Sequence, residues 1–85
     1  MYRARWAKPA LRTYDRLNGD AQRRVLSAIR DLCADPFDAA NVKALSGPLK
    51  GKYRRRVGDL RIIYSLDSTA KELYVLTIDW RGNVY

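Results

Sequence analysis

Histidine is absent from this 85-residue sequence, and cysteine occurs only once, as Cys33. Zinc sites take most of their ligands from these two residue types, so we expect no transition-metal centre and no cofactor. A single cysteine also cannot form an internal disulfide, which suits a reducing compartment.

Long apolar runs are missing as well. No stretch approaches the roughly 20 apolar residues of a membrane-spanning helix, and the start of the chain lacks the apolar core of a signal peptide. We therefore expect a cytoplasmic protein without a membrane partner. The length fits one domain over residues 1–85, with a modest core.

Negative charge is scarce, because 9 Asp and Glu stand against 17 Lys and Arg, and the net charge is +8. Such a balance favours polyanionic partners: nucleic acid, an anionic membrane surface or an acidic protein. The excess is concentrated between Lys43 and Arg61, where seven cations and one anion, Asp59, leave a local charge of +6.

The basic stretch 52–57 has the alternation of a strand, whose successive side chains point to opposite faces. Three cations would share one face: Lys52, Arg54 and Arg56. The other face would carry Tyr53, Arg55 and Val57. Gly58-Asp59 is a short turn signal that returns the chain antiparallel, so Arg61 would join the cations.

The first half of the chain predicts one strand and two helices. Residues 2–6 alternate as in a half-buried strand. Pro9 suits the first turn of a helix that Asn18-Gly19 ends. Asp20 would cap a second helix, which ends at Asp35-Pro36. Its apolar residues repeat every three or four positions, at Ala21, Val25, Ala28, Ile29 and Leu32.

The second half predicts a sheet. Residues 37–51 contain proline and glycine, which predicts a connecting loop. Residues 67–71 predict a turn, and the apolar residues 73–78 predict an interior strand. The order β-α-α-β-β-β predicts an α+β fold, in which a helical hairpin packs on one face of a small, mainly antiparallel four-stranded sheet. The other face would be left for function.

The residues of the second half resemble the RelE/ParE toxin superfamily. The resemblance rests on the basic strand 53–57, on the segment 58–64 that follows it, and on an apolar strand followed by Arg81 and Val84-Tyr85. It implies a toxin of a type II toxin-antitoxin system with a RelE-like fold. RelE toxins bind the ribosome and cut messenger RNA in the A site, whereas ParE toxins inhibit DNA gyrase.

The resemblance also implies a set of catalytic residues: Arg54, Arg56, Arg61, Arg81 and Tyr85. The flanking residues expected to contact RNA are Lys50, Lys52, Arg55 and Trp80. The sequence departs from the family pattern in several places. Arginine stands at the first two catalytic positions, where lysine is frequent. Trp80 and Asn83 stand where many relatives have histidine and an acidic residue, and Arg55 replaces a core aliphatic residue.

Metal-independent RNA cleavage requires a base for the 2′-hydroxyl, stabilisation of the phosphorane charge and protonation of the leaving oxygen. Guanidinium groups suit the second task, but an arginine pKa above about 12 excludes the first. The base would be Tyr85, Lys52 or a carboxylate. Arg61 could instead form an ion pair with Asp59 or Asp79, and Trp80 could stack on a base or pack in the core.

Three functions remain open at this point: a ribosome-dependent endoribonuclease, a gyrase inhibitor that is not an enzyme, and an RNA-binding module without catalysis. The first would bind the ribosome and messenger RNA. Both toxin functions imply a cognate antitoxin and a toxin-antitoxin hetero-oligomer. We expect an acidic antitoxin segment along the helices or over the cationic face.

Overall fold

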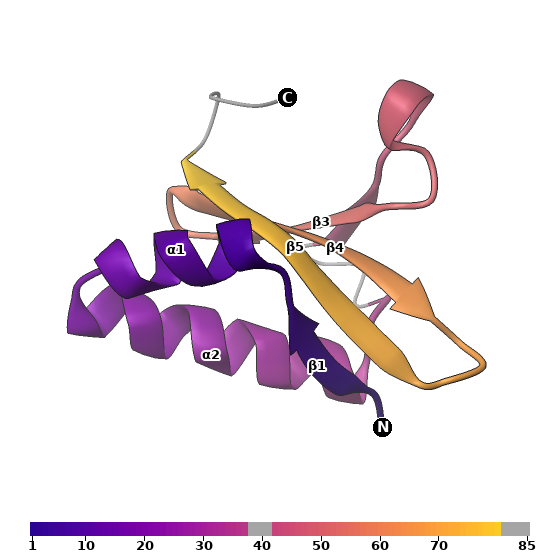
Figure 1. Ribbon diagram of the computed structural model, residues 1–85, viewed down its shortest axis with the longest axis horizontal. Helices are drawn as coiled ribbons and strands as arrows, with labels where there is room; N and C mark the ends of the chain where they lie inside the picture. Colours follow the sequence, from indigo (N-terminus) through magenta and orange to yellow (C-terminus); the bar gives the residue numbers. More distant parts are fainter. Residues whose placement is uncertain (38–41, 81–85) are drawn as a thin grey trace.

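The computed structural model describes residues 1–37 and 42–80. The elements follow in the order β1 (Arg3–Trp6), α1 (Lys8–Arg16), α2 (Gly19–Ala34), β2 (Val42–Ala44), the 3-10 turn η1 (Gly47–Leu49), β3 (Tyr53–Val57), β4 (Leu60–Asp67) and β5 (Glu72–Trp80). Figure 1 shows α1 and α2 together on one side of the sheet. The predicted helical hairpin on one sheet face, and with it the α+β class, is therefore confirmed.

The sheet is mixed, with strand order β1-β5-β4-β3-β2. β1 pairs parallel with β5, and the other three pairs are antiparallel. The predicted count of four strands is wrong, because β2 lies inside the segment expected to be a loop. β2 has only three residues and sits at the sheet edge, so it is too short to carry an alternation signal.

The cap of α2 also differs from the prediction. Asn18, and not Asp20, is the N-cap, since its side-chain oxygen accepts a hydrogen bond of 2.8 Å from the backbone N–H of Ala21. Asp20 lies in the first turn, where a carboxylate favours the positive end of the helix dipole. Asparagine and aspartate are both good caps, so the sequence alone does not distinguish Asn18 from Asp20. Pro9 lies in the first turn of α1, as expected.

The core lies between α2 and the inner face of the sheet. Four of the five apolar residues of the predicted α2 stripe are buried: Val25, Ala28, Ile29 and Leu32. β4 and β5 supply the facing side chains Leu60, Ile62, Tyr64, Leu73, Val75 and Ile78. The Tyr64 hydroxyl donates a hydrogen bond of 2.7 Å to the Pro36 carbonyl. This bond connects the end of α2 to the middle of the sheet.

The turn between β3 and β4 requires its glycine. Gly58 has a φ of 58°, in the left-handed region that side chains disfavour. A Cβ at this position would also lie 3.3 Å from Nη2 of Arg24 on α2. The side chain of Arg24 therefore extends from α2 to the β3–β4 turn.

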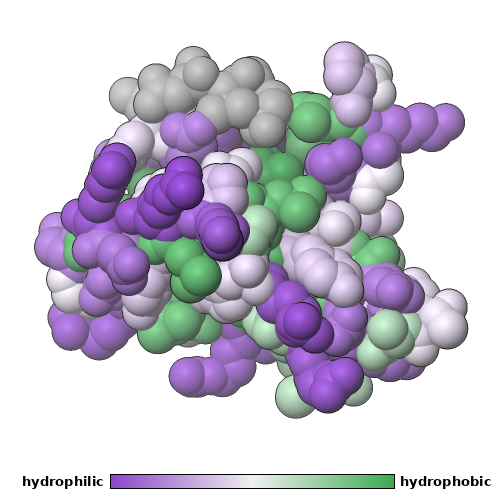
Figure 2. Space-filling view, viewed as in Figure 1, coloured by the Kyte–Doolittle hydropathy of each residue, from purple (hydrophilic) through white to green (hydrophobic). Residues whose placement is uncertain are grey.

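Hydrophilic side chains cover much of the face that α1 and α2 present, with apolar residues between them (Figure 2). Neither of the described helices combines the length and the apolar composition needed to cross a bilayer.

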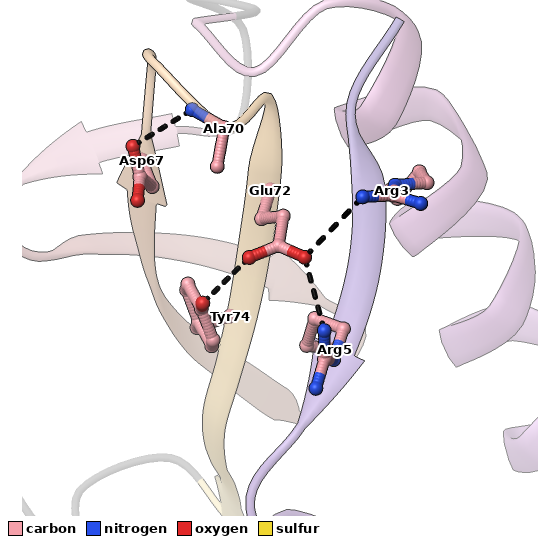
Figure 3. A network of polar contacts seen from close by, with 6 residues as sticks. All are labelled: Arg3, Arg5, Asp67, Ala70, Glu72 and Tyr74. Atoms are coloured by element: carbon pink, nitrogen blue, oxygen red, sulfur yellow. Dashed lines mark hydrogen bonds and ion pairs between the residues drawn. The ribbon is translucent and has the colours of Figure 1, made fainter.

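A buried carboxylate joins the edge strand β1 to β5. Glu72 is the one charged residue that is buried in the described part of the chain. Its carboxylate accepts a hydrogen bond of 3.0 Å from Arg5, lies 3.6 Å from Arg3, and accepts a hydrogen bond of 2.7 Å from the Tyr74 hydroxyl (Figure 3). The Tyr74 hydrogen bond, with smaller contributions from Arg5 and Arg3, holds the pKa of Glu72 below its ordinary value although burial opposes this.

We expect Glu72→Gln to change how stability depends on pH. A depressed folded-state pKa contributes stability above the unfolded pKa of about 4.3, and this contribution is lost as pH falls through the folded pKa. The difference in free energy of unfolding between wild type and Glu72→Gln should therefore be largest near pH 6 and shrink below about pH 4.3. Urea unfolding at pH 6, 4 and 3 measures it.

Asp31→Asn on the exposed side of α2 is the control, and its stability difference from wild type should vary less with pH. An equal variation in both variants would contradict the role assigned to Glu72.

Candidate functional site

Two cross-strand rows of side chains lie on the sheet face opposite the helices. One row joins Arg56 of β3, Arg61 of β4 and Asp79 of β5. The next row joins Lys43, Arg54, Ile63 and Thr77. Side chains directly opposite one another on neighbouring strands have Cβ atoms about 4.5–5.5 Å apart. The guanidinium groups of Arg54, Arg56 and Arg61, which we call the arginine cluster, therefore share one small area.

The arginine cluster has no carboxylate partner among the residues that the structure describes. The ion pairs of the described residues lie outside the cluster and join Glu72 to Arg3 and Arg5, and Asp20 to Arg23. The ion pair considered between Arg61 and Asp59 or Asp79 is not formed. The Nε atoms of Arg54 and Arg61 are buried and make no hydrogen bond. Leaving such donors unsatisfied costs about 1–3 kcal/mol each, so an anion with several oxygens would relieve the cluster.

The charges of the cluster also disfavour one another. Burial, and then the neighbouring charges of Arg61 and Arg56, lower the pKa of Arg54 from its ordinary value. A like charge destabilises the charged form of a group, and a bound anion reverses that effect. The electrostatics thus agree with the unsatisfied donors in favouring an anionic ligand.

A cavity of about 240 Å³ opens beside the cluster, lined by Arg56, Gly58, Asp59 and Arg61. Each guanidinium presents a rigid fork of donors that matches two oxygens of a phosphate. The sheet holds both arginines, because their positions are fixed by the β3–β4 register. This arrangement can bind a phosphate group and stabilise additional negative charge on it.

The structure brings together three of the five predicted catalytic residues, Arg54, Arg56 and Arg61. The other two, Arg81 and Tyr85, lie outside the described residues.

The predicted RNA-contacting residues are spread over both faces. Lys52 directly precedes β3, and Lys50 follows η1. Arg55 lies on the helix side of β3, and its Nη1 donates a hydrogen bond of 2.6 Å to the Arg56 carbonyl. Trp80 ends β5 with 51% of its surface exposed, so it is not a core residue.

Asp79 is a member of the site that sequence reasoning considered only as an ion-pair partner. It lies opposite Arg61, and its Oδ1 accepts a hydrogen bond of 2.8 Å from the Trp80 backbone N–H. Because Ile78 is buried under the helices, strand alternation places Asp79 on the arginine-cluster face. Counting outward from Ile78 in the sequence could have found it. No group of three potential metal ligands occurs within 1–37 and 42–80.

Comparison with known proteins agrees with the fold. The family model for the ParE toxin of type II toxin-antitoxin systems matches residues 4–85. The chain therefore belongs to this family, and it is a toxin of a type II toxin-antitoxin system. No curated protein matches its sequence.

Solved structures with the same fold include RelE-type toxins and a YoeB/ParE toxin from Agrobacterium tumefaciens. The archaeal RelE-RelB complex from Pyrococcus horikoshii is 30% identical, with a TM-score of 0.82, over 98% of this chain and 98% of the matched chain. The RelBE2 complex from Mycobacterium tuberculosis is 27% identical, with a TM-score of 0.82, over 94% and 98%. The isolated E. coli RelE toxin is 18% identical, with a TM-score of 0.79, over 100% and 92%, and shares the fold. The resemblance inferred from the sequence is confirmed.

We expect pyrophosphate to raise the melting temperature of this protein by filling the arginine cluster. A ligand at a hundred times its Kd stabilises the folded state by about 2.7 kcal/mol. Arg61→Gln should lose most of this shift, measured against its own melting temperature without ligand. Arg30→Gln, the same change on the exposed side of α2, should keep it. Equal shifts in the two variants would exclude an anion site at the cluster.

Proposed function

We propose that this toxin is a ribosome-dependent endoribonuclease that cuts messenger RNA in the A site. The observation that carries the proposal is the convergence of Arg54, Arg56 and Arg61, with buried unsatisfied donors, beside a cavity that fits a phosphate. A surface with these properties is suited to the negative charge that grows on a phosphate during transfer.

The reaction needs no metal ion. The 2′-oxygen attacks the adjacent phosphorus, the bond from phosphorus to the 5′-oxygen breaks, and a 2′,3′-cyclic phosphate and a 5′-hydroxyl result. Arg54, Arg56 and Arg61, together with Arg81, bind the phosphate oxygens and stabilise the phosphorane. Fixed donors directed at the developing charge are commonly the largest single catalytic contribution.

Proton transfer falls to other groups, because an arginine does not act as a base near neutral pH. Asp79 lies opposite Arg61 and is the carboxylate that we assign to accept the 2′-hydroxyl proton. Tyr85 then donates a proton to the leaving 5′-oxygen or stacks on a base. Lys50 and Lys52, which precede β3, contact the RNA backbone, and Trp80 contacts a base.

The partner that restrains this activity would be a cognate antitoxin. Two of the similar structures are complexes named RelBE2 and RelE-RelB. An acidic antitoxin segment over the arginine cluster would neutralise its charge and block access of RNA.

Inhibition of DNA gyrase is the second candidate function. The family model that matches residues 4–85 is the ParE model, and the chain has no histidine to serve as a base. In that case the arginine cluster would bind an anionic surface without catalysis.

Primer extension on programmed ribosomes tests the enzymatic function. We expect cleavage within the A-site codon by the wild-type protein. Arg61→Ala should lower the rate by about 10²–10³, the usual cost of removing one preorganised donor to an oxyanion. Asp79→Asn should also lower it, because the amide cannot accept the 2′-hydroxyl proton, and Tyr85→Phe tests protonation of the leaving group.

The control is Arg30→Ala, which removes an exposed arginine far along α2 and should cut at the wild-type rate. If the wild-type protein stops growth without any cut in messenger RNA, the ribonuclease proposal fails, and inhibition of supercoiling by purified gyrase becomes the decisive assay.

A further inference from the structure

A second cavity lies beside the β3–β4 turn, on the helix side of the sheet. Its volume is about 180 Å³. It is lined by Arg24, Val57, Asp59, Leu60 and Trp80, together with Asn18, Asp20 and Ala21 at the start of α2. Pockets for drug-sized ligands measure about 300–1,000 Å³. The size of this cavity, which we call the Trp80 pocket, therefore limits its occupant to a fragment such as a single nucleobase.

The apolar part of the pocket suits a flat ring. Trp80 forms one wall and is 51% exposed, which is unusual for so large an apolar side chain. Val57 and Leu60 supply the apolar floor. Aromatic side chains that present a free face hold unstacked bases, and such a contact is typically worth about 1–3 kcal/mol per base.

The polar part of the pocket selects among the bases. The guanidinium of Arg24 lies close to the β3–β4 turn, with Nη2 3.3 Å from the position that a Cβ at Gly58 would occupy. Asp59 makes no ion pair with any described residue. Guanine offers two acceptors, O6 and N7, to an arginine. Its adjacent N–H groups can donate hydrogen bonds to a carboxylate. Adenine lacks the O6 acceptor, so it satisfies Arg24 less well.

The Trp80 pocket and the phosphate cavity lie on opposite faces of the β3–β4 turn and share one lining residue. Asp59 lines both cavities. The pair Val57 and Leu60 follows directly on the pair Arg56 and Arg61 in the β3–β4 ladder, and the two pairs point to opposite faces. An RNA strand at the hairpin tip could therefore place a phosphate on one side and a splayed base on the other, as single-stranded RNA commonly does when proteins bind it.

We propose that the Trp80 pocket binds a guanine base of the RNA strand whose phosphate lies on the arginine cluster. The proposal rests on the proposed function only in taking RNA as the ligand. Trp80 stacks on the guanine, Arg24 donates to O6 and N7, and Asp59 accepts from the N–H edge. The pocket thus gives the toxin a preference for sites that contain guanine.

Titration of the ¹⁵N-labelled protein with 5′-GMP, 5′-AMP and ribose 5-phosphate tests this site. The chain has two tryptophans, Trp6 and Trp80, so their indole N–H signals report separately on the pocket and on a distant control position. We expect 5′-GMP to shift the Trp80 signal and leave the Trp6 signal in place. It should bind about tenfold more tightly than ribose 5-phosphate, as stacking predicts.

Substitutions separate the two halves of the pocket. Trp80→Ala should reduce the affinity for 5′-GMP to that for ribose 5-phosphate, and Trp80→Phe should keep part of the difference. Arg24→Met should remove most of the preference for 5′-GMP over 5′-AMP, because it removes the donors to O6 and N7. Phe37→Ala is the matched control, because Phe37 is 56% exposed and lies outside both cavities.

Equal affinity for 5′-GMP and ribose 5-phosphate, or an unmoved Trp80 signal, would overturn the proposal. The proposed function fails independently of this result. If 5′-GMP binds at Trp80 but ribosomes show no cut, the ribonuclease is refuted and the pocket stands. If ribosomes are cut but Trp80 does not respond, the pocket alone is refuted.

Discussion

The alternation of the β3–β4 hairpin is the constraint on which the site depends. β4 must turn Leu60, Ile62 and Tyr64 toward the helices, because these residues form much of the small core. With a period of two, that burial forces Arg61 to the other face, and the hairpin register sets Arg56 opposite it. The hydrophobic core therefore assembles the arginine cluster without any attraction between its members.

The arginines at the two ends of this sheet face differ in whether they have a carboxylate partner. Near β1, Arg3 and Arg5 both pair with Glu72, and that network connects β1 to β5. Near the β3–β4 turn, Arg54, Arg56 and Arg61 are left without a described carboxylate partner. The arginines near β1 have an acidic partner, whereas those of the arginine cluster have none among the described residues. Unpaired charges of this kind are typical of binding sites, which are maintained at a cost in stability.

The sequence predicted the helical hairpin, the interior strand and the cationic face because each depends on a local period. Val25, Ile29 and Leu32 repeat as a helix stripe, and Arg54 and Arg56 alternate as a strand. It missed β2, whose three residues are held by pairing with β3, and it chose Asp20 over Asn18 as the cap. Strand alternation from Ile78 could have placed Asp79 on the cationic face. The Trp80 pocket depends on register and packing between distant segments, which no local pattern contains.

The salt dependence of RNA binding tests most directly whether the arginine cluster holds phosphate. For single strands, the slope of log K against log salt changes by about 0.7 for each phosphate neutralised. A variant with Arg54, Arg56 and Arg61 changed to glutamine should show a slope shallower by about 2 than the wild-type slope. Glutamine at the exposed helix residues Arg12, Arg16 and Arg30 should leave the slope close to wild type. Equal slopes in the two triple variants would contradict the account.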